Sequence, residues 1–158
     1  MRKIKISSDR KYEVLIGVNW LTEKTLIEEN HGKILYILPE NLKEILNLGD
    51  LKYTFFTPDA EEQKSADILK SLWDFCGEIG LKRNDAIVAI GGGATTDLGG
   101  FVAATWLRGI NWYSIPTSIA GSIDAAIGGK TGINSKYGKN LIGSFYSPTK
   151  VVIDLSFI

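Results

Sequence analysis

A glycine-rich turn that directly follows an apolar run constrains the fold of this chain more than any other stretch. Residues 85–90 are apolar after their first residue and too few for a helix. Such a run is typical of a central parallel strand covered on both faces. Gly91, Gly92 and Gly93 follow it. Without Cβ atoms the backbone can adopt positive φ, and its N–H groups can approach an anion at the start of the next helix.

The turn predicts a site for a phosphate-bearing ligand, although the motif leaves a second interpretation open. Gly91-x-Gly93-x-x-Thr96 has the first two glycines of a dinucleotide-binding fingerprint, with threonine at the third position. A tight strand-to-helix turn with nothing bound would use the same glycines. Motifs elsewhere in the chain are needed to distinguish a ligand site from an unoccupied turn.

Composition favours one globular domain. A chain of 158 residues, 44% of them hydrophobic, can build a core. Basic and acidic residues number 18 each, so net charge favours neither nucleic acid nor a membrane surface as a partner. No apolar stretch has the length of a signal peptide or a membrane span. A single cysteine, Cys76, excludes an internal disulfide and is expected to pack inside a helix. We therefore expect a cytoplasmic protein.

The expected order of elements is that of an α/β protein. Residues 3–6 and 12–16 are strand candidates on either side of a turn at 7–10, so they predict an N-terminal hairpin. Strands and helices then alternate, as a doubly wound sheet requires. The expected helices cover 18–29, 42–48, 59–79 and 99–104, with another starting at 116–118, and the expected strands cover 33–38, 51–56, 85–90 and 110–115. The predicted fold is a Rossmann-like doubly wound, mostly parallel sheet with an N-terminal β-hairpin.

The acidic segment at the start of the third helix has two interpretations. Asp59 and Glu62 have the spacing of a helix-capping pair, and acidic residues suit a helix N-terminus. The segment also carries Glu61 and Lys64 at the carboxyl end of a strand, where α/β sheets bind ligands. The functional alternative is that a carboxylate and a lysine hold the hydroxyls and charge of a nucleotide.

Basic residues dominate the last third of the chain. Asp124 is the only acidic residue between Leu98 and Ile153. The basic residues there are interleaved with glycines, which predicts a pocket for a small, multiply anionic substrate, with a solvated face as the alternative. A P-loop is excluded, because Asp124 stands where its first glycine would be. The basic residues are Arg108, Lys130, Lys136, Lys139 and Lys150.

Together these motifs resemble the amino-terminal domain of the 3-dehydroquinate synthase family, which belongs to the sugar-phosphate cyclases. Two positions depart from the family pattern: Ser118 replaces the second threonine of Pro-Thr-Thr, and Ala60 replaces the glycine of Asp-Gly-Glu-x-x-Lys. The segments that carry the resemblance are 59–64, 91–97, 108–109, 116–118, 124–131 and 138–145.

The resemblance implies an NAD-dependent cyclase that does not consume NAD. Its substrate would be DAHP, the phosphorylated seven-carbon keto acid of the shikimate pathway of aromatic amino-acid biosynthesis, which loses phosphate and closes to 3-dehydroquinate. The alternatives are the NAD-binding domain of another sugar-phosphate cyclase and a free-standing NAD-binding module. We expect the 158-residue chain alone to be inactive.

The resemblance also implies roles for individual residues. Asp124, Lys130 and Asn140 would contact the substrate, and Arg108 and Lys139 would serve its anionic groups or the cofactor. The residues implied to hold NAD are Asp59, Glu61 and Lys64 at the adenosine, and Gly92, Gly93, Ala94, Thr95, Thr96, Asp97, Thr117 and Ser118 nearer the pyrophosphate and nicotinamide, with Lys130 and Lys139 beside them.

A divalent metal, zinc or cobalt, is implied only for a full-length enzyme. The family holds it with a glutamate and two histidines in a second, helical domain. The only histidine, His31, stands in a helix-ending turn, where a cap or surface role is expected. We therefore expect residues 1–158 to form the NAD-binding domain without a metal site, as part of a longer enzyme that is a homodimer.

Overall fold

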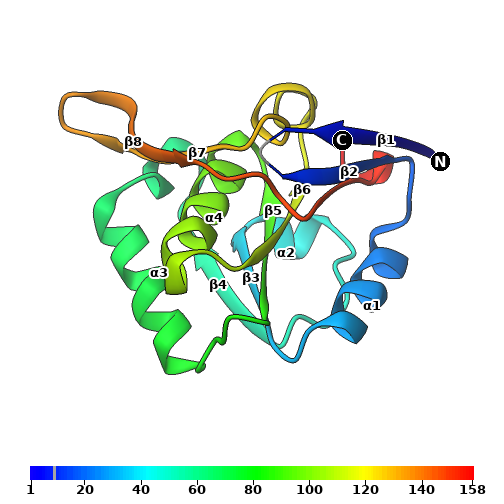
Figure 1. Cartoon of the computed structure of the whole chain (residues 1–158), viewed down its shortest axis with the longest axis horizontal. Coiled ribbons are helices and arrows are strands. Elements are labelled where there is room, and N and C mark those ends of the chain that lie inside the picture. The colour runs from blue at the N-terminus through cyan, green and yellow to red at the C-terminus, as the bar shows by residue number, and fades with distance from the viewer. Residues whose placement is uncertain (9) are drawn as a thin grey trace.

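The computed structural model describes residues 1–8 and 10–158, and it shows one central sheet with helices on both faces (Figure 1). Strand order is β1-β2-β9-β6-β5-β3-β4. β1 and β2 form an antiparallel hairpin, and every other pair of neighbours in this sheet is parallel. The strands are β1 (Arg2–Ser7), β2 (Lys11–Ile16), β3 (Ile34–Pro39), β4 (Tyr53–Thr57), β5 (Ala86–Gly91), β6 (Asn111–Pro116) and β9 (Lys150–Ile153).

The predicted fold class is confirmed, including the N-terminal hairpin. Part of the turn expected at 7–10 is Asp9, which lies outside the described residues. All six residues of β5 are buried, as its uninterrupted apolar sequence predicts for a central strand. Successive residues serve opposite faces: Ile87 packs into the core on one side of the sheet and Val88 into the core on the other.

Four α-helices cover the two faces. α3 and α4 lie on one face, and α1 and α2 lie on the other (Figure 1). Asn19 caps α1 by accepting a hydrogen bond from the Thr22 N–H. Within the described residues, no helix is both long and apolar enough to cross a membrane. The helices are α1 (Trp20–Asn30), α2 (Leu42–Ile45), α3 (Ala66–Glu78) and α4 (Gly93–Thr105).

The third expected helix is two elements, and the capping pair predicted at its start is wrong. Residues Ala60–Gln63 form a 3₁₀ turn, η1, in which Asp59 makes no side-chain cap. Ala60 takes a φ of 49°, at the position where the family pattern has glycine. α3 begins after Ser65, whose hydroxyl accepts from the Ile68 N–H at 3.2 Å. The acidic segment is therefore a separate turn at the carboxyl end of β4.

A second, two-stranded sheet in the last third escaped the sequence patterns. β7 (Lys130–Ser135) and β8 (Gly138–Phe145) pair antiparallel, and their hairpin projects beyond the central sheet (Figure 1). β7 packs on α4, and β8 is exposed along most of its length. Glycines in β7 and β8 interrupt the alternation of apolar and polar residues that marks a strand in a sequence. Packing on α4 shows that β7 is a strand. Upstream, the helix expected at 116–118 is short and ends in a π-helical turn, η3 (Gly121–Ala125).

α4 approaches both sheets closely because two of its residues have no side chain. A Cβ at Gly99 would lie 2.5 Å from the Cβ of Ala89 on β5. A Cβ at Gly100 would lie 2.5 Å from Cγ2 of Thr131 on β7. These two glycines therefore let the helix pack closely against both sheets. The helix begins at Gly93, earlier than the predicted 99–104.

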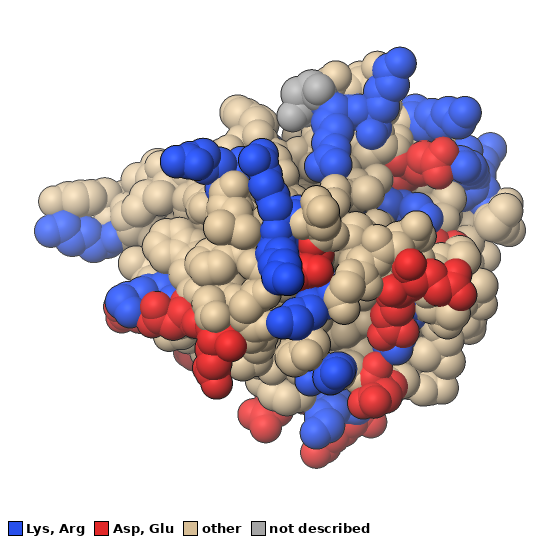
Figure 2. Space-filling view, turned by 60° about the horizontal axis from the view of Figure 1, so that its bottom comes forward, with Lys and Arg blue, Asp and Glu red and all other residues tan. Residues whose placement is uncertain are grey.

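The prediction that Cys76 packs inside a helix is confirmed. Cys76 is fully buried, and this burial raises the pKa of its thiol to about 12, as expected for a packed thiol. Figure 2 shows side chains of both charge signs on the face in view, basic ones gathered toward its upper edge and acidic ones mainly below.

The close approach of α4 to β5 predicts a stability change. Gly99→Ala should lower the free energy of unfolding by about 1–3 kcal/mol, the usual cost of overpacking, although alanine favours a helix over glycine. The matched control is Gly77→Ala on α3, where the new Cβ meets only Trp106 at 3.7 Å and should stabilise slightly. Urea unfolding measures both, and a Gly99→Ala variant as stable as wild type contradicts the packing argument.

Candidate functional site

The predicted site residues gather where β5 ends and α4 begins, around two cavities. The first, here called the turn cavity, has a volume of about 470 Å³ and lies against the glycine turn and η1. The second, here called the hairpin cavity, has a volume of about 380 Å³ and lies between α4 and the β7–β8 hairpin. Predicted cofactor residues in the wall of the turn cavity are Asp59, Glu61, Gly92, Gly93, Ala94, Thr95 and Thr117.

In the glycine turn, Gly91 lies against Thr95, and the N-terminus of α4 has no side-chain cap. A Cβ at Gly91 would lie 2.4 Å from Oγ1 of Thr95, so only glycine fits there. Gly92 has a φ of −72°, and α4 begins at Gly93, so among the three glycines the positive φ expected of the turn occurs at Gly91 alone. Gly92 supplies no side-chain cap, which leaves the first N–H groups of α4 for another acceptor.

Two threonines follow on the first turn of α4. Thr96 Oγ1 donates to the Gly93 carbonyl at 3.0 Å. Thr95 Oγ1 is buried and has no hydrogen-bond partner among the described residues, although Thr95 contributes to the wall of the turn cavity. A buried hydroxyl without a partner is uncommon and suggests a group that binds beside it.

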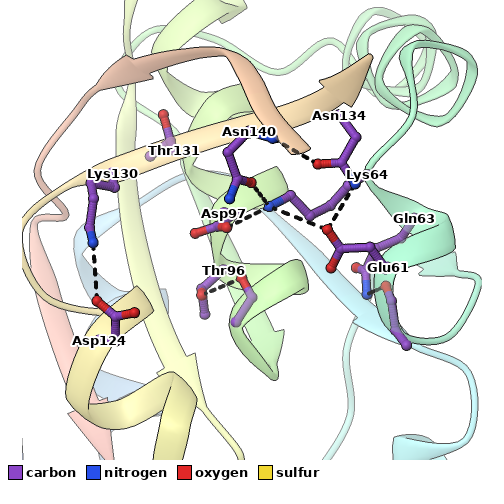
Figure 3. Close-up of polar contacts among 12 residues, drawn as sticks. Glu61, Gln63, Lys64, Thr96, Asp97, Asp124, Lys130, Thr131, Asn134 and Asn140 are labelled. Carbon is purple, nitrogen blue, oxygen red and sulfur yellow. Dashed lines mark hydrogen bonds and ion pairs between the residues drawn. The ribbon is translucent and has the colours of Figure 1, made fainter. Parts of the chain in front are cut away.

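A buried lysine joins the two cavities. Lys64 is only 3% exposed, and its Nζ donates to Oδ2 of Asp97 at 2.7 Å and to Oδ1 of Asn140 (Figure 3). Its Nζ also lies 3.9 Å from Oε1 of Glu61. Lys64 was expected to bind the cofactor directly. Its ammonium contacts residues of η1, α4 and β8, so it organises the site from within, and its contact with a cofactor stays a prediction.

Burial and hydrogen bonding shift the two carboxylates of this network in opposite directions. Burial raises the pKa of Asp97, and the ion pair with Lys64 offsets only part of that effect. The pKa of Glu61 is lowered, first by a hydrogen bond from Asn134 and then by the charges of Lys64 and Lys139. Glu61 is therefore an ionised acceptor at the edge of the turn cavity at neutral pH.

The hairpin cavity presents an accessible ammonium group. Lys130 Nζ donates to Oδ1 of Asp124 at 3.0 Å, and the two side chains are 60% and 81% exposed (Figure 3). An ion pair this exposed contributes little to stability and can exchange one partner for a ligand. Asp97, Thr131 and Asn140 complete the polar part of the wall. The cavity can thus receive an anionic, hydroxyl-bearing molecule.

Five predicted residues lie outside both cavity walls: Lys64 and Thr96, whose contacts are given above, and Arg108, Lys139 and Ser118. Arg108 follows the far end of α4, whose 13 residues at about 1.5 Å each separate it from the glycine turn by roughly 20 Å. Lys139 lies exposed on β8 and acts on Glu61 only through its charge. Ser118 caps the next turn by accepting from the Gly121 N–H at 3.1 Å.

Sequence reasoning missed two residues that hold the site together. Gln63 is buried, accepts from Thr57 Oγ1 at 3.2 Å and donates to the Ala60 carbonyl at 2.8 Å, which fixes η1. Asn134 donates to Oε1 of Glu61 at 2.8 Å. No local pattern marks Asn134, because this partner is 73 residues away in the chain.

The described part of the chain has no group of three or more His, Cys, Asp or Glu side chains placed to hold a metal ion. His31 is the C-cap residue of α1, as expected for a structural histidine. Its Nδ1 lies 2.9 Å from the Asn84 carbonyl oxygen and its Nε2 lies 2.9 Å from the Tyr113 hydroxyl.

Solved structures share this fold over nearly the whole chain. A 2-deoxy-scyllo-inosose synthase, complexed with carbaglucose-6-phosphate, NAD+ and Co2+, superposes with a TM-score of 0.88 at 24% identity over 99% of this chain and 47% of its own. The 2-epi-5-epi-valiolone synthase ValA from Streptomyces hygroscopicus, with NAD+ and Zn2+ bound, gives 0.84 at 24% identity over 98% of this chain and 46% of its own. At this identity the likeness shows the fold alone.

Sequence relatives are closer. The 3-dehydroquinate synthase of Streptomyces avermitilis is 45% identical over 92% of this chain, and that of Corynebacterium jeikeium is 40% identical over 99%. The chain spans 42% and 46% of their respective lengths. The family model described as "3-dehydroquinate synthase N-terminal" matches residues 54–158, which include the hairpin cavity, the whole polar network and the turn cavity apart from Pro39, Asn41 and Leu42. This chain therefore belongs to the 3-dehydroquinate synthase family and corresponds to its N-terminal region.

Proposed function

We propose that this chain is the NAD-binding part of an enzyme that converts DAHP, a phosphorylated seven-carbon keto acid, to 3-dehydroquinate with release of phosphate. The observation that carries the proposal is the pair of cavities on either side of Lys64, one built for a phosphate at a helix N-terminus and one with an accessible ammonium. Relatives at 39–45% identity named 3-dehydroquinate synthase favour this reaction over those of other sugar-phosphate cyclases, which match at 24%.

NAD fits the turn cavity. The uncapped N–H groups at Gly93 and Ala94 can donate to a pyrophosphate, which the positive end of α4 also favours. The unpartnered hydroxyl of Thr95 lies beside them, and the ionised Glu61 can accept from a ribose hydroxyl. When bound, NAD supplies a reversible hydride acceptor for a substrate alcohol.

The substrate fits the hairpin cavity. The exposed Lys130 ammonium pairs with Asp124 in the wall of this cavity, and it can exchange that partner for an anionic group of the substrate. The amide of Asn140 offers a donor to a substrate oxygen, because its carbonyl oxygen is already used by Lys64. Asp97 lies between the two cavities and is held by the same lysine, so it can meet the reacting end of both ligands.

The complete enzyme, in this proposal, is longer than this chain and contains a divalent metal. Two structural neighbours have NAD+ together with Co2+ or Zn2+ bound, which supports a metal in the reaction. The described residues of this chain do not fit a metal site, so no step is assigned to a metal here. A homodimer, a cytoplasmic location and inactivity of the chain alone stay predictions from the family resemblance.

Gly92→Ala tests the cofactor site with little strain on the fold. The backbone at Gly92 suits any residue, and the added Cβ would lie 3.8 Å from the nearest atom outside its chain neighbours, Ser118 Oγ. The methyl group fills space where the pyrophosphate would approach, so NAD affinity should fall about tenfold or more, roughly the value of one charged hydrogen bond. Calorimetry at millimolar NAD measures it, with Gly77→Ala as the matched control. Equal affinity of wild type and Gly92→Ala would place the cofactor elsewhere.

Lys130→Met tests the substrate site in the full-length enzyme. We expect kcat/KM to fall roughly a hundredfold, about 3 kcal/mol, because one well-placed charged contact is lost. NAD affinity should change little, since Lys130 lies outside the turn cavity. Lys136→Met is the control in the same hairpin, where Nζ lies over the Tyr137 ring at 4.9 Å from its centroid. Phosphate release at the wild-type rate from Lys130→Met would refute the assignment.

A further inference from the structure

Asn134 forms part of neither cavity wall, yet it bonds to residues of both. It lies on β7 where pairing with β8 is irregular: Ile133 pairs with Ile142, and the next pair is Ser135 with Gly138. Irregular positions of this kind release a residue from the ladder and re-aim its side chain. Here the side chain is aimed at the polar network.

The two ends of the Asn134 amide have different partners (Figure 3). Nδ2 donates to Oε1 of Glu61 at 2.8 Å, and Oδ1 accepts from the Asn140 N–H at 2.9 Å. The backbone N–H of Asn134 donates to the Lys64 carbonyl at 2.9 Å. One residue therefore contacts η1 at Glu61, the C-cap residue of η1 at Lys64, and β8 at Asn140.

Asn140 depends on this contact for its backbone conformation. Its φ of 58° lies in the left-handed region, which asparagine tolerates better than most residues but which still needs support. The Asn134 oxygen holds the Asn140 N–H while Lys64 holds its side chain. The two contacts together hold the backbone and the amide of Asn140, which forms part of the wall of the hairpin cavity.

We propose that Asn134 is a positioning residue that fixes the Glu61 carboxylate and the Asn140 backbone together, so that one wall of each cavity depends on a single amide. The identity of the two ligands rests on the proposed function, but the positioning itself does not. The amide suits this role because it offers a donor to Glu61 and an acceptor to the Asn140 N–H on two separate atoms.

The first test measures NAD affinity by calorimetry in the 158-residue chain. Asn134→Ala and Asn134→Asp should each weaken NAD binding about tenfold, because alanine leaves Glu61 unheld and aspartate repels it. The matched control is Ser135→Ala in the same hairpin, which removes only the acceptor of the Tyr137 N–H and should stay within about twofold of wild type. Unchanged affinity in both Asn134 variants, with wild type binding NAD, overturns the proposal.

A second test separates positioning from general packing. In a Glu61→Gln background, Asn134→Asp should weaken NAD binding less than about twofold, because the introduced glutamine amide can donate to the introduced aspartate. In the wild-type background the same substitution should weaken NAD binding about tenfold. A role in packing alone would give the same loss in both backgrounds, and that result would refute the positioning role.

A third readout needs no ligand. The Asn140 N–H should exchange with solvent about tenfold faster in Asn134→Ala than in wild type, and at the wild-type rate in Ser135→Ala. Equal exchange in Asn134→Ala overturns the proposal. Failure of the wild-type chain to bind NAD, or equal binding by Gly92→Ala, would instead refute the proposed function, and the exchange rates would still decide the role of Asn134.

Discussion

The buried ammonium of Lys64 is the interaction on which the site depends. It joins η1, α4 and the β7–β8 hairpin through Glu61, Asp97 and Asn140, which come from three separate parts of the chain. A buried charge is tolerated only when it is paired and hydrogen-bonded, so these elements have to meet in one arrangement. The hairpin belongs to no larger sheet, and this network together with packing on α4 fixes where it lies.

In the proposed function, the two cavities would bind negative charge by different physical means. At the turn cavity the donors are backbone N–H groups at the start of α4, which are rigid and carry only the partial charge of the helix end. At the hairpin cavity the donor is the full charge of Lys130 on an exposed side chain. Backbone donors have fixed positions, whereas the exposed Lys130 side chain can exchange Asp124 for another anion.

Glycines allow both arrangements by letting elements approach closely. Gly91 leaves room for Thr95 beneath the turn, and Gly99 lets α4 touch β5. The hairpin also has a glycine pair, Gly132 opposite Gly143, where an added Cβ at either position would lie within 3 Å of the facing backbone. Close backbone contact therefore shapes the cavities as much as side chains do.

The sequence by itself determined the fold class and most of the residues that the structure gathers around the two cavities. The apolar run of β5 and the glycines after it predict a central parallel strand with an anion site at its carboxyl end, because burial on both faces and absent side chains are local properties. The acidic turn at 59–64 and the basic last third predict residues that the structure gathers around two cavities. Only the tertiary structure decided that Lys64 holds other residues of the site and that Asn134 bonds to Glu61. Each of these depends on contacts between residues far apart in the chain, for which no local spacing or composition provides a signal.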